Sequence, residues 1–109
     1  MPWRYQPVIE TDNQGDQVSL CEVYFDDQGK LENWTEHAGM TPCGETIDEL
    51  TASLIQMLTD AMAWVPVNFS DLRVGMTFEK AITMEQRNEI ADMIEAWDGA
   101  AKNARKLVN

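Results

Sequence analysis

The chain has 109 residues, of which 44% are hydrophobic and 25% charged, values typical of one ordinary globular domain. Its 19 acidic and 8 basic residues give a formal net charge of −11 at pH 7, which argues against direct binding to DNA or RNA phosphates. No stretch approaches the roughly 20 apolar residues of a membrane span, and the first residues lack the apolar segment of a signal peptide. We therefore expect one cytoplasmic domain, residues 1–109, that does not bind membranes.

The negative charge is concentrated in the first two thirds of the chain. Residues 1–71 contain 13 acidic residues against Arg4 and Lys30, whereas residues 72–109 contain six acids and six bases. This asymmetry predicts two surfaces with different roles, an acidic part over residues 1–67 and a helical extension over residues 68–109. Lys102, Arg105 and Lys106 near the end of the chain are interpreted as complementing the dipole of a helix at its C-terminus, and the alternative is a basic tail that docks on a partner.

Three strands are expected in the first third. Residues 3–10 are rich in aromatic and β-branched side chains, and Pro7 suggests an edge strand, with a polar loop over residues 11–17. Residues 18–25 alternate between two largely apolar faces, and the DDQG sequence at 26–29 predicts a tight turn into a returning strand over residues 30–36.

Two helices are expected after a loop over residues 37–44. Thr46 and Glu49 form a capping-box pattern ahead of apolar residues at steps of three and four, which predicts a helix with one buried face that ends before Pro66. Residues 64–69 form either a short fourth strand or an exit loop, and residues 70–82 leave open whether they are extended or helical. Thr83 and Gln86 repeat the capping pattern before a second amphipathic helix, and we expect Gly99 to end it. The tail beyond Gly99 then continues the helix, frays, or orders against a partner.

These elements predict an α+β fold. We expect a three-stranded or four-stranded antiparallel sheet in the order strand, strand, strand, helix, optional strand, helix, with the helices packed on one face. Four tryptophans and seven methionines are expected mainly in the core, with the remainder on a contact surface.

The residues give little support for catalysis, and we expect no catalytic residue, no metal and no cofactor. His37 is the single histidine, and Cys21 and Cys43 lie 22 residues apart without a Cys-x-x-Cys motif, so zinc lacks its ligands. Two free thiols are expected, with Cys43 near a helix start the more reactive. The acidic residues at 12–16 and 26–27 suit turns better than a cation site, and no P-loop or dinucleotide fingerprint is present.

The layout of the hairpin and first helix resembles the N-terminal domain of HicB-like antitoxins. The motifs that carry this resemblance over residues 3–67 are Glu22-Val23-Tyr24-Phe25, Gly29, Trp34-Thr35-Glu36, Pro42-Cys43-Gly44-Glu45-Thr46 and Asp48-Glu49-Leu50. A group of short bacterial and phage proteins without known function shares this pattern. The resemblance implies a sheet leading into a helix, and a non-catalytic module that binds a small basic toxin or another protein, often as an oligomer. HicB-like antitoxins usually carry a DNA-binding segment after this domain, and residues 68–109 contain no obvious recognition helix.

Three functions remain as hypotheses. The first is an antitoxin-like regulatory module that masks a basic partner protein through an acidic face formed by Asp26, Asp27, Glu32, Glu36, Asp48 and Glu49. Its last helix would form a homodimer through Ile90, Ile94 and Trp97. The second is a small phage-encoded inhibitor, of the anti-CRISPR or anti-restriction type, that mimics nucleic-acid charge on a nucleic-acid-binding complex. The third is an enzyme that uses Glu36, His37 and Cys43.

Overall fold

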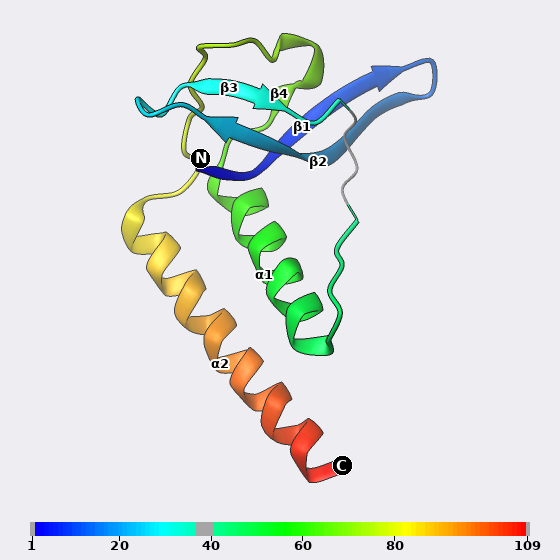
Figure 1. Cartoon of the computed structure of the whole chain (residues 1–109), viewed down its shortest axis with the longest axis vertical. Coiled ribbons are helices and arrows are strands. Elements are labelled where there is room, and N and C mark those ends of the chain that lie inside the picture. The colour runs from blue at the N-terminus through cyan, green and yellow to red at the C-terminus, as the bar shows by residue number, and fades with distance from the viewer. Residues whose placement is uncertain (1, 37–40, 109) are drawn as a thin grey trace.

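The computed structural model describes residues 2–36 and 41–108 and is α+β (Figure 1). A four-stranded sheet lies at one end, and two helices extend from one of its faces. The elements in chain order are β1 (Trp3–Asp12), β2 (Gly15–Phe25), β3 (Leu31–Trp34), α1 (Ile47–Ala63), β4 (Val67–Asn68), a short 3₁₀ turn (Phe69–Asp71) and α2 (Met84–Val108). The predicted fold class and order of elements are confirmed.

The sheet has the strand order β3-β2-β1-β4 and is mixed. Antiparallel pairing joins β1 to β2 and β2 to β3, as the sequence predicts. The fourth strand exists, but it runs parallel to β1 and pairs only with Val8 and Ile9. Helix α1 connects β3 at one edge of the sheet to β4 at the other edge. Parallel strands need such a crossover connection, and β4 accordingly runs parallel to β1. The expectation that Pro7 marks an edge strand is wrong, because β1 lies between β2 and β4, and Pro7 itself lies just before the two residues that pair with β4.

The hairpin between β1 and β2 is longer than the sequence predicts. Pairing continues to Thr11 with Asp16 and to Asp12 with Gly15, so most of the expected polar loop is strand. Gly15 has a φ of 116°, a conformation that glycine adopts without steric cost, and the turn is thereby closed tightly. The prediction failed because this end of the hairpin is exposed on both faces and lacks an apolar alternation.

The fully buried core lies on the sheet face opposite the helices. Val8, Cys21, Val23 and Leu31 are completely buried there, and Leu72 packs on them. Residues 69–78 cross this face (Figure 1), and Leu31 N–H donates to the Met76 carbonyl at 2.9 Å. The region that the sequence left open contains the 3₁₀ turn, a second turn at Val74 and Gly75, and otherwise irregular chain, and it forms neither an α-helix nor a long strand.

Helix α1 begins as predicted and packs on β1 through a narrow contact. Thr46 caps it by accepting the Glu49 N–H at 3.1 Å, while the Glu49 carboxylate accepts the Glu45 N–H at 2.7 Å. Of its side chains, Met57 and Ala63 are buried. The expectation of one buried face from Ile47 to Val65 is wrong, because the helix leads away from the sheet and several of these residues remain exposed.

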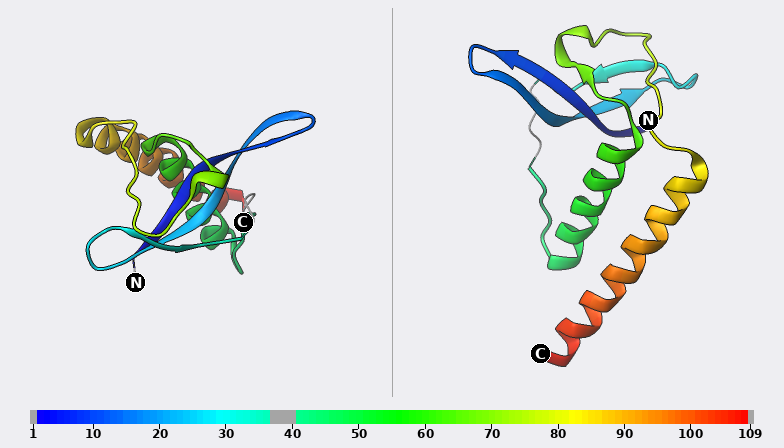
Figure 2. Two further views of the ribbon diagram at one scale, coloured as in Figure 1. Left: turned by 90° about the horizontal axis from the view of Figure 1, so that it is seen from above. Right: turned by 180° about the vertical axis from the view of Figure 1, so that it is seen from behind.

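Helix α2 is capped by Thr83, whose hydroxyl accepts the Gln86 N–H at 3.1 Å, and it runs for 25 residues. The expectation that Gly99 ends it is wrong. Glycine in a helix interior costs only about 1 kcal/mol relative to alanine, and alanines at 100, 101 and 104 favour continuation. The helix therefore extends past the N-terminal end of α1, as both side views show (Figures 1 and 2).

Gln6 is the one completely buried polar side chain among the described residues, and it connects β1 to the end of α1. Its Oε1 accepts from Arg4 Nη1 at 2.8 Å, and its Nε2 donates to the carbonyls of Pro7 and Val65 at 3.0 Å each. Every branch of the carboxamide is therefore paired, as a buried polar group requires.

Replacing Gln6 with alanine should lower the free energy of unfolding by about 2–4 kcal/mol, because it leaves the Val65 carbonyl unpaired and creates a cavity. Urea denaturation followed by circular dichroism measures this. The exposed Gln17→Ala on β2 is the matched control and should change stability by less than about 0.5 kcal/mol. Equal effects of the two substitutions would show that the buried carboxamide contributes little.

Candidate functional site

An exposed apolar stripe runs along α1. Ile47, Leu54 and Leu58 are spaced by seven and four residues, which places them on the same side of the helix. Leu54 and Leu58 expose 47% and 45% of their surface, although both were expected in the core. Single exposed apolar residues are ordinary, but a row of them on one helix is typical of a contact surface.

Helix α2 carries a second apolar stripe, of which two residues are exposed. Ile90, Met93, Ile94 and Trp97 share one side of the helix, as the sequence predicts. Ile94 is buried, with 8% of its surface exposed, and Ile90 is half-buried, whereas Met93 and Trp97 expose 55% and 66%. Of the three residues expected to mediate self-association, Trp97 is thus the most accessible.

The acidic residues expected to form one face fall into two groups. Asp26 and Asp27 lie in the turn between β2 and β3, with Glu32 on β3 and Glu36 just after it. Asp26 is engaged in the turn, because its Oδ1 accepts the N–H groups of Gln28 and Lys30 at 2.9 Å each. Asp27, Glu32 and Glu36 are exposed.

The second acidic group, Asp48 and Glu49, lies in the first turn of α1. This end of the helix points away from the sheet, while the turn between β2 and β3 lies at one end of the sheet (Figure 1). Glu49 also takes part in the helix cap. The six residues therefore do not form a single cluster, and a partner that contacts both groups must extend along α1.

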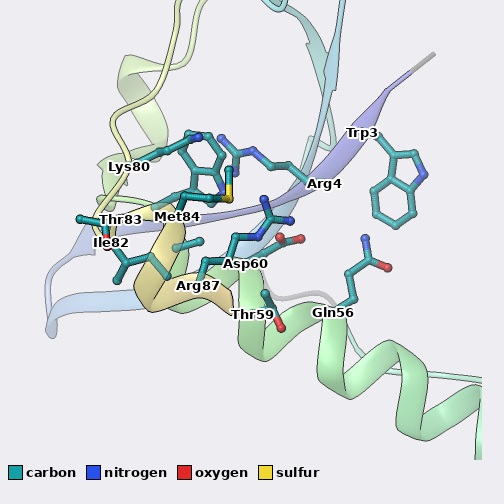
Figure 3. Close-up of a pocket in the computed structure, with 12 residues that line it drawn as sticks. Trp3, Arg4, Gln56, Thr59, Asp60, Lys80, Ile82, Thr83, Met84 and Arg87 are labelled. Carbon is teal, nitrogen blue, oxygen red and sulfur yellow. The ribbon is translucent and has the colours of Figure 1, made fainter. Parts of the chain in front are cut away.

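A cleft of about 440 Å³ lies between β1, α1 and the start of α2 (Figure 3). Its walls include Arg4 from β1, Asp60 from α1, and Lys80 and Arg87 from either side of the α2 N-terminus. Backbone hydrogen bonds from Val65 N–H to the Glu79 carbonyl (2.9 Å) and from Ala81 N–H to the Ala63 carbonyl (2.7 Å) hold the segment before α2 against the end of α1. The cleft is thus built by three segments far apart in sequence.

Arg4 is held tightly at the inner wall of this cleft. Its guanidinium carbon lies 3.6 Å from the centre of the Trp64 ring, and Phe25 and Phe78 lie within 5.3 Å and 5.1 Å. Nη1 donates to the Tyr5 carbonyl and to Gln6 at 2.8 Å each, whereas Nη2 is buried without a hydrogen-bond partner. Burial lowers the pKa of Arg4 to about 10, against the opposing effect of Asp60.

Asp60 is the acidic member of the cleft. Its Oδ2 accepts the Tyr5 N–H at 2.9 Å. Burial raises the pKa of this carboxyl, while the hydrogen bond from Tyr5 and the charges of Arg4 and Arg87 act in the opposite direction. The carboxylate therefore balances part of the positive charge around it.

Of the three residues of the enzyme hypothesis, the structure describes Glu36 and Cys43. Glu36 and Cys43 are exposed on either side of residues 37–40, and His37 lies outside the described residues. Among residues 2–36 and 41–108, no group of three or more His, Cys, Asp and Glu side chains could hold a metal ion. Cys21 and Cys43 are both free thiols, as expected.

Sequence reasoning missed the exposure of Leu54 and Leu58 and missed the cleft entirely. The apolar spacing on α1 is the same for a buried and an exposed stripe, so it carries no signal of exposure. The cleft residues come from separate segments without a shared motif. The one available signal was Arg4, a basic residue inside a predicted strand of a strongly acidic region.

Comparisons of the chain with protein-family models, with curated proteins and with solved structures find no match. The resemblance to HicB-like antitoxins therefore depends on the layout and motifs of residues 3–67 alone. Among the helices that the structure describes, none is sufficiently long and apolar to span a membrane.

The two thiols should differ strongly in reactivity. Cys21 is completely buried, and burial raises its pKa from 9.0 to about 11, which alone reduces the thiolate fraction about 100-fold near pH 8. Iodoacetamide should therefore label Cys43 at least about 100-fold faster than Cys21, as mass spectrometry of native protein at pH 8 measures. Cys43→Ser should remove the fast reaction, and rapid labelling of this variant would contradict the buried position of Cys21.

Proposed function

We propose that this chain is a non-catalytic, antitoxin-like regulatory module that binds and masks a basic partner protein. The exposed apolar stripes of α1 and α2 carry this proposal. Folded domains rarely leave several large apolar side chains uncovered along one helix, and such surfaces commonly mark sites of protein association. The HicB-like layout of residues 3–67 supports the same function by analogy.

The charge of the chain favours a basic partner. Asp48 and Glu49 lie at the N-terminal end of the α1 stripe, and Asp27 and Glu32 are exposed near the hairpin turn. An acidic surface attracts a basic protein over long range and speeds its association, while the apolar contact supplies the affinity. The same charge is compatible with mimicry of nucleic acid. Only a mimic must compete with DNA or RNA for the same protein, so a competition measurement distinguishes mimicry from masking.

The α2 stripe suits a second copy of the chain. Residues 84–98 contain five acids against Arg87, whereas residues 99–109 contain three bases and no acid. Antiparallel pairing of two α2 helices would place the acidic part of each opposite the basic part of the other. Glu95, Asp98, Lys102 and Lys106 follow at steps of three and four on one side of the helix, and Asp98 and Lys102 form an ion pair at 3.2 Å within it. Antiparallel copies would join these charges into one network of opposite charges.

Charge reversal at the turn between β2 and β3 tests partner binding. The tagged protein is purified from its native cell at low salt to identify the partner, and affinity is then measured with purified components. Asp27→Lys combined with Glu32→Lys should weaken binding at least about tenfold at low salt, because both carboxylates are exposed. Glu10→Lys with Glu79→Lys gives the same change in net charge elsewhere and should have a smaller effect.

The outcomes separate the hypotheses. A small basic protein at fixed stoichiometry supports masking, whereas a nucleic-acid-binding complex that loses its DNA or RNA supports mimicry. If the variant with Asp27→Lys and Glu32→Lys binds the partner with unchanged affinity, these two carboxylates have no role in binding. Failure of any protein to co-purify counts against both binding functions.

The mass in solution tests self-association. Light scattering during size-exclusion chromatography should give twice the 12.4 kDa of the chain, and Trp97→Glu should raise the dimer dissociation constant at least about tenfold. Val74→Ser, which alters an exposed valine away from the helices, is the matched control and should remain dimeric.

A charge swap tests the antiparallel arrangement. Lys102→Glu with Lys106→Glu, and separately Glu95→Lys with Asp98→Lys, should each weaken the dimer because like charges then meet. A mixture of the two variants should associate again. A mixture that remains monomeric would exclude antiparallel pairing through α2.

A further inference from the structure

The charge in the cleft is opposite in sign to that of the chain. Arg4, Lys80 and Arg87 are three of only eight basic residues in the protein, and all three line this cleft together with one acid, Asp60. The formal charge of these four groups is +2 in a chain of net charge −11. Such local concentration of a scarce charge is not expected from the composition.

The three cations are not neutralised by close partners. Among the described residues, none of these three cations takes part in a salt bridge, and the ion pair of Lys102 with Asp98 lies far along α2 from the cleft. Asp60 offsets part of the charge of Arg4 and Arg87, while its Oδ2 accepts the Tyr5 N–H, so a net positive charge remains in the cleft. An anion in the cleft would therefore complete the charge balance.

Arg4 provides a fixed binding group. The aromatic rings and the two acceptors of Nη1 hold its guanidinium in place, while the buried Nη2 still lacks an acceptor. A preorganised guanidinium binds phosphate or carboxylate oxygens strongly because little side-chain freedom is lost. Figure 3 shows Lys80 beside this group and Arg87, on α2, next to Asp60.

The shape and remaining walls of the cleft indicate the rest of the ligand. Trp3 and Met84 contribute exposed apolar surface, so the cleft suits an anion with an apolar or flat body. The formal charge of +2 matches a phosphate monoester, which carries about −1.5 to −2 near neutral pH. The N-terminal end of α2, with Thr83 and Met84 in the cleft wall, adds its positive partial charge in the same direction.

We propose that the cleft between β1, α1 and the N-terminus of α2 binds a small phosphate monoester with an apolar body. Lys80 and Arg87 bind the phosphate at the mouth, the fixed guanidinium of Arg4 contributes its positive charge at the inner wall, and Trp3 packs on the apolar part. This site does not depend on the proposed protein-binding function, because the cleft is distinct from the exposed stripes of α1 and α2.

Calorimetric titration of the full chain with phenyl phosphate at low ionic strength and pH 7.5 tests the proposal. Phenyl phosphate should bind at least about tenfold more tightly than inorganic phosphate, and phenol should not compete with it. Lys80→Gln and Arg87→Gln should each weaken binding about tenfold. These positions are at the mouth of the cleft, so the variants are expected to fold.

Lys30→Gln and Arg73→Gln remove exposed cations outside the cleft and should leave the affinity unchanged. Absence of phenyl phosphate binding at millimolar concentration would overturn the proposal. It would also be overturned if the two control variants weakened binding as much as the cleft variants, since the anion would then respond only to net charge.

Discussion

The structure depends on a buried polar connection at the start of β1. Gln6 links Arg4 to the carbonyl of Val65, and the Arg4 guanidinium packs on the ring of Trp64. These contacts fix the point at which α1 ends and the chain turns back to the sheet. The parallel pairing of β4 with Val8 and Ile9, and the position of the segment that leads into α2, both follow from this corner.

The same corner explains why the two sheet faces have different roles. One face is closed by residues 69–78, whose apolar side chains complete the core around Val23 and Leu31. Helix α1 contacts the other face near its own C-terminal end, and α2 follows it away from the sheet (Figure 2). Stability is thus provided largely on one face, which leaves the helical layer available for association and leaves a cleft where the helices meet β1.

Local signals in the sequence predicted local structure well. The capping pairs Thr46 with Glu49 and Thr83 with Gln86 begin both helices, and the DDQG turn leads into β3, because each signal depends on neighbouring residues alone. The prediction that Gly99 ends α2 was wrong, because a glycine ends a helix only where the surrounding chain favours a turn. The prediction that Ile47 to Leu58 form a buried face was wrong, because periodicity shows which residues share a side of a helix and not whether that side is covered.

Composition and short-range patterns encode the α+β class, the turn between β2 and β3, both helix starts and the acidity of the chain, so these features could be predicted. Three features could not be predicted: which apolar residues are covered, the parallel direction of β4, and the meeting of Arg4, Asp60, Lys80 and Arg87 around one cleft. Burial and charge balance depend on segments far apart in the chain. Their proximity is set by packing, which no local pattern records.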